Sequence, residues 1–194
     1  LFPENQQTPL PSGSLPPLPP TNTLPGGVQA YGASRDGGRR KHAGIDFDIS
    51  GNEKFYSRIG GKVIYAGNAG GGYGNVVDIY NKDLNVTERI AEAARILPGV
   101  VKGAIIRRGQ AVVEGEGSTG VIHYEIRPGK AGASGSFKGT VNPLEYLKNL
   151  EKKEAKVAST QKVSTNQELN QQTSYEVAIH ERNIIMYQKE VVLS

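Results

Sequence analysis

The sequence has 194 residues, a formal net charge of +4 and no cysteine. The lack of cysteine excludes disulfides, thiolate zinc sites and a cysteine nucleophile, and so small a charge is no signature of nucleic-acid binding. A hydrophobic content of 37% and a charged content of 22% predict one modest domain with appendages, and the sequence has no apolar run of about 18 residues that would span a membrane.

The first region in chain order, residues 1–27, is a predicted proline-rich linker or arm. It holds eight of the eleven prolines and a single charged residue, Glu4. Segments of this composition extend as polyproline helix and cannot bury a core of their own. We therefore expect this arm to contact other subunits of a larger assembly.

The second region, residues 28–147, is a predicted compact β domain. It holds 22 of the 25 glycines, and short runs of β-forming residues alternate with glycine-rich turns. This alternation predicts a mainly β fold, an antiparallel sheet, sandwich or barrel. The clearest predicted strands are Lys62–Ala66, Asn75–Tyr80, Gln110–Val113 and Val121–Arg127.

Two helices are predicted, one inserted in the β domain and one after it. Thr87–Leu97 has apolar residues at helical spacing and is followed by Pro98, which stops a helix. Residues 148–194 lack glycine and form a predicted C-terminal extension. A charged helix is predicted over Leu144–Val157, and a polar stretch follows it. Tyr175–Leu193 is rich enough in β-branched residues for one or two strands, which need a host sheet or a partner chain.

Two histidines and one aspartate are candidate metal ligands. His42 and Asp46 are four residues apart, and Gly44 between them allows the backbone to bend. His123 lies in the strand Val121–Arg127, on the face opposite the apolar residues. Two imidazoles and one carboxylate with an open fourth position form the pattern of catalytic zinc. Taken singly, each motif also fits a surface histidine without a metal.

The order of the motifs resembles that of the lysostaphin-type (LytM-like) zinc endopeptidases. His42-Ala43-Gly44-Ile45-Asp46 resembles that family's HxGxD motif, and His123-Tyr124-Glu125 resembles the end of its HLHFE-like motif. Further matches follow in the family's order at Gly61–Gly67, Gly72–Val77, Val101–Gln110 and Asn142–Leu144.

The resemblance covers about residues 28–147. It implies a small antiparallel β-sheet groove, similar to a duplicated hybrid motif. It also implies one Zn²⁺ held by His42, Asp46 and His123, and a peptidoglycan peptide as the molecule bound.

Two positions depart from the family's pattern. Val121 stands where the family has the first histidine of HxH, and Glu92 stands where it has the histidine of a YAHL-like segment. In the family these histidines are thought to serve as general base and as stabiliser of the oxyanion. Loss of a base costs about 10²–10⁴ in rate and loss of an oxyanion donor about 10²–10³. We expect weak or lost hydrolysis, with Glu92 either a replacement base or a solvated helix residue.

Three functions remain open. The first is a degenerate relative that serves as a wall-binding or structural component, in a phage tail or baseplate (virion) or in the bacterial cell envelope. The second is an active, extracellular zinc endopeptidase that cleaves peptidoglycan cross-bridges. The third is a barrel-sandwich scaffold, whose carrier form needs a lysine between methionines, whereas Met186 is the only methionine. His180 is expected to have no metal role.

Overall fold

The computed structural model describes residues 15–19, 30–49, 53–115, 120–130, 137–161 and 171–174. The chain separates into two compact units, Leu1–Leu147 and Lys148–Ser194. Helices occupy residues 143–161 and 171–174, and none of the described helices is long and apolar enough to cross a membrane. The strands predicted in Tyr175–Leu193 and most of the proline-rich arm lie outside the described residues.

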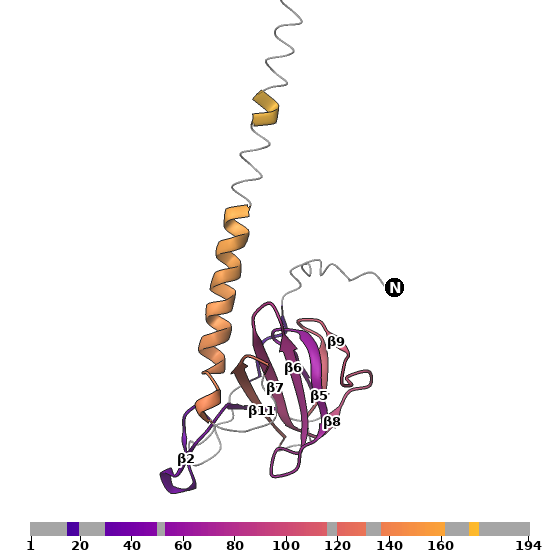
Figure 1. Ribbon diagram of the computed structural model, residues 1–194, viewed down its shortest axis with the longest axis vertical. Coiled ribbons are helices and arrows are strands. Elements are labelled where there is room, and N and C mark those ends of the chain that lie inside the picture. Colours follow the sequence, from indigo (N-terminus) through magenta and orange to yellow (C-terminus); the bar gives the residue numbers. More distant parts are fainter. Residues whose placement is uncertain are drawn as a thin grey trace, which may run out of the picture. The chain divides into compact units, whose positions relative to one another are not determined.

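A six-stranded antiparallel sheet forms the main layer of the first unit (Figure 1). The four strands predicted most clearly from the sequence are confirmed: they correspond to β5, β6, β10 and β11. In spatial order the main sheet comprises β3 (Ile45–Asp48), β11 (Val121–Pro128), β7 (Val86–Ala93), β6 (Asn75–Asn81), β5 (Gly61–Asn68) and β9 (Ile105–Ile106).

A smaller three-stranded sheet packs against the main one and closes the core. Its order is β4 (Lys54–Tyr56), β10 (Ala111–Glu114) and β8 (Arg95–Ile96). The rings of Phe47 on β3, Phe55 on β4 and Tyr124 on β11 contact one another, with centroids 5.6–6.0 Å apart. Because Phe55 belongs to the small sheet and the other two to the main sheet, this cluster joins the two layers.

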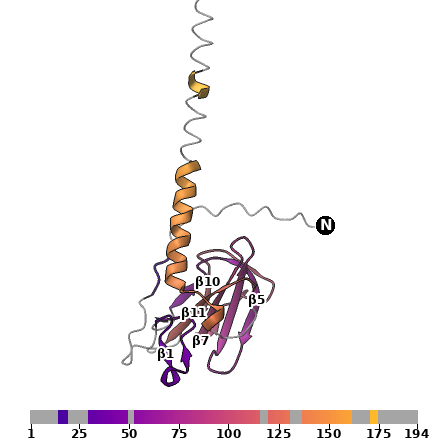
Figure 2. The same cartoon turned by 60° about the vertical axis from the view of Figure 1, so that its left-hand side comes forward.

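Among the described residues, the first unit also contains a short hairpin and two single-turn 3₁₀ helices. The hairpin consists of β1 (Ser34–Arg35) and β2 (Arg40–Lys41), joined by η1 (Asp36–Gly38), and it is labelled in Figures 1 and 2. The second 3₁₀ turn, η3 (Phe137–Gly139), precedes the helix over residues 143–161.

The prediction of an inserted helix over Thr87–Leu97 is wrong. This segment forms β7 and β8, and β7 is hydrogen-bonded to β6 on one side and to β11 on the other. Its residues form helices readily when isolated, but helix propensity is a weak preference that tertiary pairing overrides. The strand also satisfies its buried charges, since Arg89 forms a two-point ion pair with Asp78 (2.7 and 2.8 Å).

Candidate metal centre

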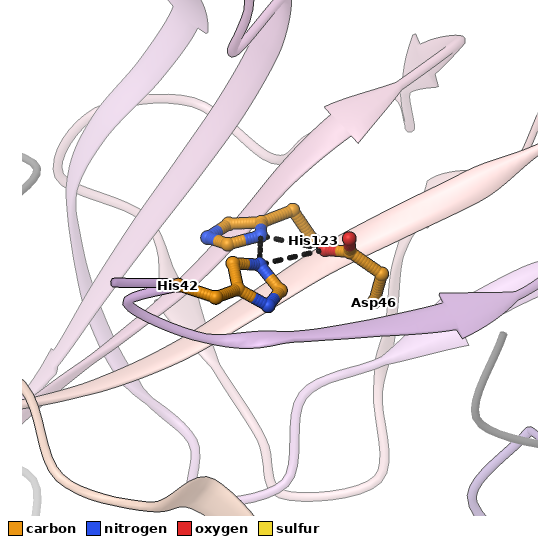
Figure 3. Close-up of side chains that lie close together, drawn as sticks. All are labelled: His42, Asp46 and His123. Carbon is orange, nitrogen blue, oxygen red and sulfur yellow. Dashed lines mark hydrogen bonds and ion pairs between the residues drawn. The ribbon is translucent and has the colours of Figure 1, made fainter. Parts of the chain in front are cut away.

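His42, Asp46 and His123 converge at the β3 edge of the main sheet (Figure 3). Asp46 on β3 lies directly opposite His123 on β11 in the strand register. His42 precedes β3, and the chain between them passes very close to β11. A side chain on Gly44 would lie 2.3 Å from the carbonyl oxygen of Tyr124. The glycine of the motif is therefore required by this close approach, not by a positive φ.

One ligand atom of each residue faces a common point. His123 Nδ1 is 2.8 Å from Asp46 Oδ1 and 3.0 Å from His42 Nε2, and His42 Nε2 is 3.2 Å from Asp46 Oδ1. Zinc bonds of about 2.0–2.1 Å in a tetrahedron place neighbouring ligand atoms about 3.3 Å apart. The three residues are 3–4% exposed, so the solvent-facing alternative for His123 is wrong. The donor set and its spacing fit a zinc ion.

Each of the three residues also forms a second hydrogen bond, on the side that faces away from the common point. His42 Nδ1 lies 3.0 Å from the carbonyl oxygen of Ala30, and His123 Nε2 lies 2.8 Å from Glu125 Oε1. Each of these ring nitrogens can donate its hydrogen there, which leaves the other nitrogen as a lone-pair ligand. Arg35 donates to Asp46 Oδ2 at 3.0 Å and leaves Oδ1 turned to the centre.

The titration of the centre follows from these contacts. Burial raises the pKa of Asp46, but hydrogen bonds with His123 and His42 outweigh burial and hold that pKa well below its usual value. Burial lowers the pKa of His123, but hydrogen bonds with Asp46 and Glu125 outweigh it and raise the pKa to about 9. Without a cation, the centre thus holds a proton in the place where a metal would neutralise the carboxylate.

The neighbours of His123 are residues that the sequence analysis did not identify as functional. The ring of Tyr73 meets the His123 ring edge-on at 5.8 Å, and the Arg89 guanidinium lies 5.4 Å from the Tyr73 centroid. Arg127 donates from Nε to Glu125 Oε2 at 2.6 Å. Glu125 and Arg127 could have been found from strand alternation, since both share a face with His123. Tyr73 lies in a glycine-rich loop, and no periodicity points to it.

Glu92 and Val121 occupy the two positions that depart from the family's pattern. Glu92 is an exposed residue of β7 with a φ of +59°, and its backbone N–H donates to the carbonyl oxygen of Tyr73 at 2.8 Å. Partial desolvation raises its pKa, opposed by the charge of His123 and reinforced by that of Asp46. Among the described residues, the ligand cluster contains His42, Asp46 and His123 but not Glu92. His180 lies outside the described residues.

Comparison with known proteins gives one family match and several relatives. The model of Peptidase family M23 matches residues 40–135. The murein hydrolase activator NlpD of Escherichia coli (strain K12) is 34% identical over 125 residues, which make up 62% of this chain and 28% of that protein. The lipoprotein NlpD of Yersinia enterocolitica is 34% identical over 107 residues, 52% of this chain and 97% of that protein. The chain thus spans less than a third of the length of the E. coli relative.

Solved structures share the fold. The catalytic domain of lysostaphin from Staphylococcus simulans aligns with a TM-score of 0.52 at 21% identity, over 61% of this chain and 89% of that domain. LytU aligns with a TM-score of 0.51 at 18% identity, over 61% of this chain and 81% of that one. The predicted antiparallel β architecture of the lysostaphin type is thereby confirmed.

Proposed function

The chain belongs to peptidase family M23, and from this premise we propose that it is a zinc-binding, peptidoglycan-directed domain with weak or lost hydrolytic activity. One observation carries the proposal. The three ligand atoms are buried and lie 2.8–3.2 Å apart, and each ligand residue forms a second hydrogen bond. In contrast, an apolar Val121 and an exposed Glu92 stand where the resemblance implies catalytic histidines.

The proposed ligands of one Zn²⁺ are His42, Asp46 and His123. Zinc bound there would supply Lewis-acid polarisation of a peptide carbonyl and a water of lowered pKa. Val121 can neither accept nor donate a proton, because its side chain is a hydrocarbon. Glu92 carries a carboxylate that could exchange a proton, but it lies outside the ligand cluster and replaces the imidazole that the resemblance implies there. Binding of a wall peptide needs neither missing histidine.

The relatives support a binding or regulatory role at the cell envelope. The E. coli relative is named a murein hydrolase activator, and the Yersinia relative is named a lipoprotein. We propose that this chain likewise acts on the wall by controlling a hydrolase rather than by cutting. Residues 1–27 and 148–194 are the proposed contacts with other subunits. Such contacts would also suit a phage tail, but the bacterial relatives favour the envelope.

An active endopeptidase is the second candidate function, favoured by the complete ligand set. The family match and the lysostaphin-type fold replace the barrel-sandwich alternative. Incubation of the zinc-loaded chain with purified peptidoglycan separates the two candidates. We expect the chain to sediment with the wall, to accelerate an added murein hydrolase, and to release fragments at least about 10⁴-fold more slowly than the lysostaphin catalytic domain.

The matched control for this experiment is Glu92→Gln. A metal-dependent release of fragments that approaches the rate of the lysostaphin domain and disappears in Glu92→Gln would identify an active enzyme with Glu92 as its base. That result would contradict the proposed degenerate role.

A further inference from the structure

A pocket of about 580 Å³ lies at the β5 side of the main sheet and contains three lysines. It takes no part in the metal centre, which lies at the β3 edge, because β11, β7 and β6 separate β3 from β5. Strand spacings of about 4.8 Å put β11 and β5 roughly 14 Å apart. The lining consists of Lys62, Val63, Ile64, Tyr80, Lys102, Gly103 and Lys130.

Hydrogen bonds of the backbone bring the three lysines together from separate segments. Lys62 on β5 lies opposite Tyr80 of β6 and Ile105 of β9 in the strand register, so these three side chains share one face of the sheet. The loop that carries Lys102 is tied to β5, since Gly103 N–H donates to the Val63 carbonyl at 2.8 Å.

The position of Lys130 is set by the backbone hydrogen bonds of the preceding residue, Gly129. Gly129 N–H donates to the carbonyl oxygen of Asn85 at 2.7 Å, and its own carbonyl accepts a hydrogen bond from Thr87 Oγ1 at 2.8 Å. The backbone on both sides of the pocket is therefore held by hydrogen bonds to β5, to β7 and to the β6–β7 turn. A ligand would meet a preformed pocket and would order only lysine side chains.

The pocket carries uncompensated positive charge. In the part of the chain that the structure describes, none of Lys62, Lys102 and Lys130 forms an ion pair with a carboxylate. Three like charges around one pocket raise its local potential and concentrate anions there. A group with several negative oxygens, such as a phosphate, can accept charge-assisted hydrogen bonds from more than one ammonium group.

Two exposed apolar side chains border the same pocket. Val101 precedes Lys102 and is 60% exposed, and Ile105, opposite Lys62, is 62% exposed. A free phosphate or a wall carboxylate gains nothing from such neighbours. An anionic lipid does, because its headgroup meets the lysines while the apolar side chains enter the boundary of the acyl chains.

We propose that this pocket binds the phosphate headgroup of an anionic phospholipid and holds the domain on a membrane surface. Val101 and Ile105 would enter the interface beside the headgroup. The contact lies at the opposite edge of the sheet from the metal centre, so the domain can occupy a membrane surface and a wall peptide together. The proposal does not depend on zinc or on hydrolysis.

Sedimentation of the full chain with vesicles tests the proposal. We expect binding to vesicles of phosphatidylglycerol and phosphatidylethanolamine, none to pure phosphatidylcholine, and weaker binding as salt rises. Substitution of Lys62, Lys102 and Lys130 together by glutamine should weaken binding on the order of a hundredfold, at about fivefold per lysine. Val101→Ser with Ile105→Ser should weaken it roughly tenfold.

A charge-matched triple variant, Lys148→Gln, Lys152→Gln and Lys153→Gln in the exposed helix, is the control and should bind as the wild type does. Equal losses in the two triple variants would overturn the proposal, because binding would then follow net charge alone. Binding of inorganic phosphate or of wall fragments without binding of anionic vesicles would overturn it too. Zinc content, measured in each variant, should stay unchanged, which separates a failure here from a failure of the proposed function.

Discussion

The three predicted metal ligands and the two positions that depart from the family's pattern differ in burial and in their contacts. His42, Asp46 and His123 are buried, face one point and are each held by a second contact. Val121 and Glu92 stand at the two positions that depart from the family's pattern: the first is apolar and the second is exposed. Holding a metal and moving a proton are therefore separate tasks. Only the first requires the geometry that this chain retains.

Removal of a ligand should have the largest effect. Asp46→Ala takes away the only carboxylate of the triad and should raise the Kd for zinc more than a hundredfold, since a ligand in a structural zinc site is worth roughly 3 kcal/mol. Competition with a chromophoric chelator measures the Kd. Asp83→Ala, which removes an exposed carboxylate in the β6–β7 turn, should leave it unchanged. A normal Kd in Asp46→Ala would place the metal elsewhere.

Introduction of a histidine at Val121 tests the other half of the comparison. Val121→His should raise the zinc-dependent release of wall fragments about a hundredfold, because it supplies a proton carrier or an oxyanion donor beside an intact triad. Val121→Ala, which supplies neither, should leave the rate as it is. If Val121→His retains zinc and shows no gain, the missing histidine is not what limits hydrolysis.

The contacts behind the ligands should matter less than the ligands themselves. Glu125→Gln weakens the acceptor that orients His123 and should lower zinc affinity about 10–100-fold. Arg35→Gln loosens Asp46, but Arg35 is more exposed, so its effect should be smaller. Zinc titrations of the two variants rank the contacts. An affinity of Glu125→Gln equal to that of the wild type would show that His123 is oriented by packing alone.

The pH dependence of stability should show the smallest effect. In the metal-free protein the pKa of His123 is raised to about 9 from an ordinary 6.5. The stability that this shift contributes is complete below pH 6.5 and is lost as pH rises through about 9. The Tm of chelator-treated protein should therefore fall on the order of several degrees over this range. Zinc-loaded protein should not show this fall, because zinc binds the neutral imidazole. Equal Tm profiles would contradict this assignment.

Runs of β-forming residues separated by glycine-rich turns were sufficient to predict β5, β6, β10 and β11. This pattern failed for β7, because Thr87–Leu97 consists of good helix formers and the decisive contacts come from β6 and β11, which are distant in sequence. The three residues that converge were predicted from the resemblance of the ordered motifs to the lysostaphin-type family, because their spacing alone left a surface histidine equally open. Arg35, Ala30 and Tyr73 could not be predicted as neighbours of the site, because Arg35 lies in a two-residue strand, the other two lie in loops, and none of these segments carries a periodic signal.

The location of zinc in crystals of the protein tests the central claim most directly. Anomalous scattering at the zinc edge should show one peak per chain, about 2.0–2.1 Å from His42 Nε2, Asp46 Oδ1 and His123 Nδ1. A metal found elsewhere, or no peak after soaking in zinc, would contradict the account.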